Sequence, residues 1–151
     1  MANTFTSCTL VCMIEGGHMD FIYEEKSPYS LEETITRLKE RLPKEGFGIL
    51  WELNFKHKLK EKGLSLKDDF WIFEVCNPAK AESVLNEMIQ AGYFLPCKMA
   101  VYTREDAVYI GLPRPVELIG LITRDDLMRS FAEDVESSLT EVIQFVISDG
   151  L

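Results

Sequence analysis

A long amphipathic segment near the C-terminus constrains the fold more than any other feature. Between residues 123 and 148 large apolar side chains recur at steps of three or four, which is the spacing of one helix face. These side chains are Leu127, Phe131, Val135, Leu139, Val142 and Val146. Thr123 and Asp126 are candidates for the N-terminal cap. A helix with such a stripe has to bury it against a second layer of structure.

Two further helices are expected upstream, and each is marked by a capping signal. Ser30 followed by Glu33 forms a capping box, and apolar residues then recur at helical spacing as far as Leu42. Asn77-Pro78 is the second signal, because Asn accepts free backbone N–H groups and Pro at the first helical position has none to lose. The second helix is expected to end at Gly92, and a short lysine-rich helical turn is expected over 56–63.

Strand patterns lie between these helices. The segments 21–25, 46–55, 70–76, 95–103 and 107–112 have the alternation and the aromatic or β-branched content of strands. The last two are joined by REDA and are expected to form a hairpin, after which PRP breaks the sheet. The order β-α-β-(short α)-β-α-β-β-α predicts an α+β fold.

The bulk composition indicates one folded domain. The chain has 151 residues, 46% of them hydrophobic, which is enough to bury a core without disulfides. Its net charge of -9 opposes attraction to phosphate backbones and anionic lipid, so neither nucleic acid nor membrane is an expected partner. Cysteines at 8, 12, 76 and 97 match neither a zinc spacing nor a secreted disulfide framework, so we expect a cytoplasmic protein.

The first 18 residues differ from the remainder of the chain. They are poor in charge and run into GGHM, a junction typical of a leader or a cloning tag ahead of Met19. We therefore expect a loosely ordered tail over 1–18 and a single α+β domain over 19–151. No metal site is assigned to Cys8, Cys12 and His18.

Several segments resemble one known family. GFGILWELNFKHKLKEKGL, FEVCNP and GYFLPCKMAVY, followed by PRP and a long last helix, are similar to the domain-of-unknown-function 302 family over roughly residues 20 to 148. The resemblance implies a fold like that of the TATA-box-binding protein, with helices on one face of a curved antiparallel sheet, and subunits that pair as dimers. It implies no established activity and no DNA binding, since function resides in sites rather than in folds.

Strand alternation sorts the side chains of such a sheet into two faces. With the apolar side under the helices, the other face is expected to be mixed in character. It would collect Leu50, Glu52, Asn54, Ile72, Glu74, Lys98, Tyr102 and Tyr109. Glu52 and Glu74 could act as an acid–base pair or hold a cation, or they could form a cross-strand charge pair with Lys98. Such a face needs cover, which a second subunit or a small-molecule pocket would supply.

Cys76 and Cys97 are the candidates for nucleophilic or redox chemistry. Cys76 precedes a helix N-terminus, which favours the thiolate, whereas Glu74 on the same strand face disfavours it. A Cys–His couple would require the fold to bring in His57. Alternation places Cys97 under the helices and Cys76 on the opposite face, so no disulfide is expected.

The residues favour a cytoplasmic, homodimeric binding module for a small molecule or a partner, with no cofactor and no metal. The expected ligand contacts are Glu52, Glu74, Lys98, Tyr102 and Tyr109. Two alternatives stay open. One is a thiol-dependent redox or transfer enzyme that uses Cys76 or Cys97, and the other is a purely structural interaction domain.

Overall fold

The frame of the molecule is an antiparallel sheet of five strands. The computed structural model describes residues 21–149. The strands are β1 (Ile22–Ser27), β2 (Gly48–Asn54), β3 (Phe70–Cys76), β4 (Cys97–Arg104) and β5 (Ala107–Pro113). They lie in the order β1-β5-β4-β3-β2, and every neighbouring pair is antiparallel. With the helices, this arrangement confirms the predicted α+β class.

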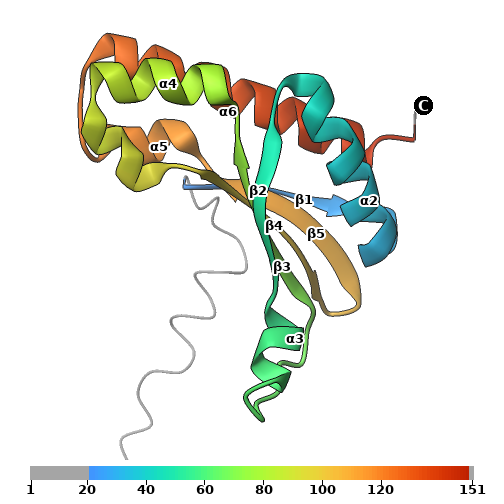
Figure 1. Cartoon of the computed structure of the whole chain (residues 1–151). Coiled ribbons are helices and arrows are strands. Elements are labelled where there is room, and N and C mark those ends of the chain that lie inside the picture. Colours follow the sequence, from blue (N-terminus) through green and yellow to red (C-terminus); the bar gives the residue numbers. More distant parts are fainter. Residues whose placement is uncertain (1–20, 150–151) are drawn as a thin grey trace, which may run out of the picture.

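The described residues form five helices, three of which cover one face of this sheet. They are α2 (Leu31–Arg41), α3 (Phe55–Lys60), α4 (Pro78–Glu87), α5 (Pro115–Gly120) and α6 (Asp126–Ile147), with two 3-10 turns, η1 (Leu42–Glu45) and η2 (Ile89–Phe94). In Figure 1, α2, α4 and α6 lie together across one side, and α3 lies at the far end of β2 and β3. Within residues 21–149 no helix is long and apolar enough to cross a membrane.

The capping signals act where the sequence places them, with one exception. The Ser30 hydroxyl accepts a hydrogen bond of 3.2 Å from the Glu33 N–H, and the Asn77 side chain accepts one of 3.2 Å from the Lys80 N–H. The exception is α6, which is capped by Asp125 rather than by Thr123 and Asp126. Asp125 is the better cap because its carboxylate accepts a hydrogen bond of 3.0 Å from the N–H of Met128, the third residue of the helix.

The core lies between the sheet and α6. Fully buried residues of the sheet, including Phe73, Met99 and Ile110, pack with Leu139 and Ile143 of α6. The predicted helix stripe is correct over this part. At the N-terminal end it is wrong, because Leu127 is 60% exposed and the buried stripe passes through Met128 and Ala132 instead. These two residues belong to a second, smaller core cluster that also contains Val84, Ala91 and Ile119.

A β-bulge in β2 corrects the predicted face of its second half. Ile49 pairs with Val75, but the next pair is Trp51 with Glu74, so Leu50 is an extra residue. The extra residue reverses the alternation, and Glu52 lies opposite the fully buried Phe73. The prediction that Glu52 and Asn54 share a face with Tyr102 is therefore wrong.

The face of the sheet away from the helices is called the open face below. The register places on it Trp51, Leu53, Phe70, Ile72, Glu74, Lys98, Ala100, Tyr102 and Tyr109.

Two elements were not expected from the sequence. The helix that begins at Pro78 ends at Glu87, and the chain continues as η2 instead of remaining helical to Gly92. After β5, Pro115 begins the short helix α5, because Pro is well accepted at the first helical position. Both elements lie at the end of the molecule that holds the second core cluster.

Candidate functional site: a cavity at the end of the sheet

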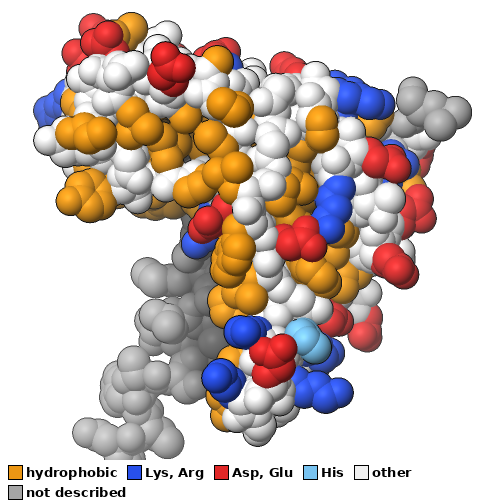
Figure 2. Space-filling view, in the orientation of Figure 1, with side chains coloured by type: hydrophobic (Ala, Val, Ile, Leu, Met, Phe, Trp, Pro, Cys, Tyr) orange, Lys and Arg blue, Asp and Glu red, His pale blue; other side chains and the backbone are white. Residues whose placement is uncertain are grey.

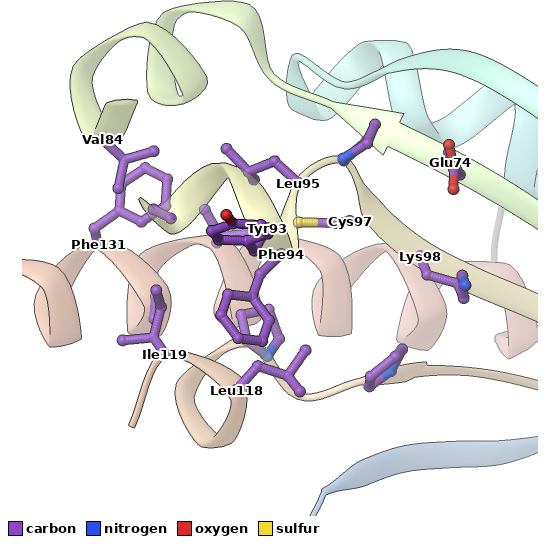
Figure 3. Close-up of a pocket in the computed structure, with 16 residues that line it drawn as sticks. Glu74, Val84, Tyr93, Phe94, Leu95, Cys97, Lys98, Leu118, Ile119 and Phe131 are labelled. Carbon is purple, nitrogen blue, oxygen red and sulfur yellow. The ribbon is translucent and has the colours of Figure 1, made fainter. Parts of the chain in front are cut away.

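A cavity of about 270 Å³ lies where η2, α5 and the first half of α6 meet the ends of β3 and β4. Its walls are mainly apolar and include Val84, Leu95, Leu118, Ile119, Phe131 and Ala132. Figure 3 shows these side chains converging from different elements on one space. Since five separate parts of the chain contribute, the cavity is a product of the tertiary fold.

Two opposite charges lie at one side of this cavity. Glu74 on β3 and Lys98 on β4 are directly paired in register, and both residues line the cavity. Glu74 is half-buried and Lys98 is exposed. Among residues 21–149, no ion pair or side-chain hydrogen bond joins either of them to a partner. The cross-strand pair considered from the sequence is therefore not closed, and in Figure 3 Glu74 and Lys98 lie to one side of the apolar side chains.

The surroundings of the cavity are apolar as well. Ile89, Tyr93 and Leu121 expose between 66% and 88% of their surface on η2 and beside α5. Figure 2 shows hydrophobic surface gathered over this end of the molecule, whereas the α3 end is mainly charged. The apolar character of the cavity thus continues onto the neighbouring surface.

Cys97 lines this cavity and has an unreactive environment. Burial raises the pKa of its thiol to about 11, and the neighbouring Cys76 adds to the effect. Both cysteines are free, as expected, but both also line a second, smaller cavity. Strand alternation therefore does not separate them as predicted, because Cys76 is the last residue of its strand.

His57 is not positioned to act on either thiol. It lies on α3, next to the start of β3, whereas Cys76 is at the end of that strand, roughly 20 Å further along. The His57 side chain instead contacts Glu61 of its own helix at 3.2 Å. Among the described residues, the fold therefore does not bring His57 to Cys76 or Cys97.

The predicted tyrosines form a separate aromatic ladder on the open face. Tyr102 stacks on Phe70 and on Tyr109, with ring centroids 5.2 and 5.6 Å apart. The Tyr102 hydroxyl donates to Glu24, and burial together with this carboxylate raises the pKa of Tyr102. The Arg104 guanidinium lies over the Tyr109 ring at 4.4 Å. Tyr102 is four residues from Lys98 along β4, about 13 Å further along the strand.

The five predicted contact residues thus fall into three places. Glu74 and Lys98 are brought together at the cavity, and Tyr102 and Tyr109 are brought together in the ladder. Glu52 lies on the helix-covered face and forms an ion pair of 2.7 Å with Lys39 of α2. We therefore remove Glu52 from the candidate site.

Comparison with known proteins places this fold in a family. A family model for the domain of unknown function DUF302 matches residues 23–146. The chain belongs to the DUF302 family. A crystal structure of an uncharacterized conserved DUF302 protein from Bacillus stearothermophilus is 41% identical, with a TM-score of 0.81 over 85% of this chain and 99% of that one. No curated protein matches the chain.

The apolar part of the site in this DUF302 chain was missed from the sequence. Its walls come from α5 and η2, which the sequence treats as a sheet-breaking PRP segment and the tail of a helix. The available signal was the run Val116, Leu118 and Ile119 directly after Pro115, which is apolar enough for a short buried helix. Within residues 21–149 no group of three His, Cys, Asp or Glu side chains is arranged to hold a metal. Cys8, Cys12, His18 and the predicted 1–18 tail lie outside the described residues.

Proposed function

We propose that this DUF302 protein is a binding module for a small molecule, which occupies the cavity between η2, α5 and α6. The carrying observation is an apolar cavity lined at one side by two opposite charges that have no ion-pair partner among residues 21–149. Ligand sites are commonly apolar concavities in which a few polar groups fix orientation. The volume of about 270 Å³ lies near the lower end of such sites, so it supports a ligand of one ring or one short branched chain.

The walls of the cavity are held in place by contacts outside it. Arg114, just before α5, donates to the Glu136 carboxylate of α6 at 2.7 Å. The same carboxylate accepts the Val116 N–H at 3.0 Å. These charge-assisted bonds fix α5 on α6 without using Glu74 or Lys98. A cavity that is already formed binds at a lower entropic cost than one that has to be ordered.

A homodimer through the open face is part of this proposal. Trp51 is 50% exposed there, directly opposite Glu74 in the register, and Ile22 is 45% exposed on β1. A two-fold symmetric partner is the commonest way to cover such a surface. Free cysteines at 76 and 97 support a reducing cytoplasm as the setting. Analytical ultracentrifugation of the parent chain and of Trp51→Glu tests this dimer. We expect the parent chain to sediment as a dimer and Trp51→Glu as a monomer, and a monomeric parent chain would contradict the proposal.

The thiol-dependent enzyme has little support from the geometry. A pKa of about 11 leaves Cys97 protonated at neutral pH, and His57 is at the wrong end of β3. A purely structural interaction domain would leave the cavity without a ligand. Occupancy of the cavity is therefore the quantity that separates the proposals.

Indole is a suitable neutral probe, because it is apolar, small and independent of the two charges. We expect saturation-transfer NMR to detect indole on the parent chain and on Leu121→Trp, whose side chain is exposed beside α5. Leu118→Trp, which fills the cavity from its wall, should abolish the signal. Equal signals from all three proteins would contradict occupancy of this cavity.

A further inference from the structure

We infer that the ligand is a zwitterion with an apolar body, of the class of an α-amino acid with a large apolar side chain. This inference rests on the proposed function, because it names the chemistry of the molecule that would occupy the same cavity. It is carried by three features of the site: the pairing of its two charges, the mainly apolar side chains of its walls, and its volume.

The two charges have the spacing that a zwitterion needs. Glu74 and Lys98 are direct cross-strand neighbours, so their Cβ atoms are separated by about 5 Å. An ammonium and a carboxylate attached to one carbon can therefore meet both side chains at once. Glu74 would accept from the ammonium, and Lys98 would donate to the carboxylate, each through a charge-assisted hydrogen bond.

A ligand with a single charge can form an ion pair with only one of the two charged side chains, Glu74 and Lys98. An apolar carboxylate would pair with Lys98 but bring its own negative charge beside Glu74. An apolar amine would pair with Glu74 and be repelled by Lys98. Since neither side chain has another ion-pair partner among residues 21–149, the remaining charge would stay uncompensated in both cases.

The walls select the body of the ligand. The lining side chains with polar atoms are Glu74, Lys98, Cys97 and Tyr93, and Tyr93 is 88% exposed at the rim. The side chains of Phe131, Leu118 and the other apolar lining residues offer no hydrogen-bond partner to a hydroxyl or an amide. Burial of an unpaired polar group is unfavourable, so polar side chains would be rejected. A volume of about 270 Å³ also excludes a nucleotide or a longer peptide.

Three probes with the same ring isolate the contribution of each charge. They are L-phenylalanine, 3-phenylpropanoate and 2-phenylethylamine, and L-asparagine serves as a polar zwitterion. By isothermal titration calorimetry we expect L-phenylalanine to bind about 10- to 100-fold more tightly than each of the other three, since a hydrogen bond to a charged group contributes roughly that factor. Equal affinities for the three ring compounds would overturn the inference.

Substitutions then assign the charges. Glu74→Gln should lower the affinity for L-phenylalanine about tenfold or more and should not lower the affinity for 3-phenylpropanoate. Lys98→Met should lower the affinity for the two probes that carry a carboxylate, L-phenylalanine and 3-phenylpropanoate. It should not lower the affinity for 2-phenylethylamine. The matched controls are Glu52→Gln, on the other face, and Lys26→Met, exposed on β1 outside the cavity; neither should change any affinity. An equal loss in Glu52→Gln and Glu74→Gln would contradict the assignment.

The neutral probe separates this inference from the function on which it rests. If indole binds to the parent chain and is blocked by Leu118→Trp, but L-phenylalanine binds no more tightly than the single-charge probes, the ligand class is wrong and the binding module stands. If neither indole nor any ring compound binds, both proposals fail together.

Discussion

The environment of Cys97 makes a quantitative prediction about thiol chemistry. An ordinary cysteine with a pKa near 8.5 is about 3% thiolate at pH 7. With its pKa raised to about 11, Cys97 is about 0.01% thiolate, roughly 300-fold less. The thiolate is the reactive form, so alkylation of Cys97 should be slowed by about that factor.

The test uses a Cys76→Ser variant in which Cys97 is the sole described thiol, with peptide mapping to separate it from Cys8 and Cys12. Iodoacetamide labelling at Cys97 is followed against pH in the native protein and in urea. Burial is the largest cause of the raised pKa, so the native rate should still rise well beyond pH 9 after Cys76 is removed. The pH midpoint is independent of steric access. A native rate that levels off near pH 8.5, or that equals the rate in urea at pH 7, would refute this account of the site.

Three further predictions concern stability. Leu139→Ala, at a fully buried position of α6, should lower the free energy of unfolding by about 2–5 kcal/mol in urea denaturation, and a loss below about 1 kcal/mol would contradict its place in the core. Glu136→Gln removes one charged partner of Arg114 and should cost roughly 1–3 kcal/mol of stability while weakening indole binding; unchanged binding would argue against this anchor for α5. The pKa of Tyr102 is raised in the folded state, so ionisation of this hydroxyl disfavours folding. Its contribution to the free energy of unfolding is complete below pH 10 and is lost as the pH rises further. The melting temperature should therefore fall less steeply above pH 10 in Tyr102→Phe than in the parent chain, and parallel curves would contradict the perturbation.

Much of the fold is readable because its signals are local. Ser30 and Asn77 cap helices where their residue types predict, and Phe73 and Val75 lie on the predicted face of β3. The β4–β5 hairpin forms with Glu105 and Asp106 at positive φ, as a tight turn between adjacent antiparallel strands requires. In each case the determining interaction lies within a few residues of the signal.

The errors arise where one local event changes everything that follows it. The bulge at Leu50 contributes a single residue, yet it moves Glu52 to the opposite face, because strand alternation has a period of two. Nothing in GFGILWELNF distinguishes a bulged strand from a regular one. The apolar cavity was missed for another reason: it needs residues from α4, η2, α5 and α6 at one place, and sequence spacing does not report on such contacts.

The most direct test of the central claim is the place at which a small apolar molecule binds. Backbone amide shifts of the ¹⁵N-labelled protein can be followed by NMR during an indole titration. Occupancy of the cavity predicts saturable shifts centred on Glu74, Lys98 and the α5 segment around Leu118. Shifts centred instead on the Tyr102–Tyr109 ladder, or no saturable shifts at all, would contradict a ligand site at this end of the sheet.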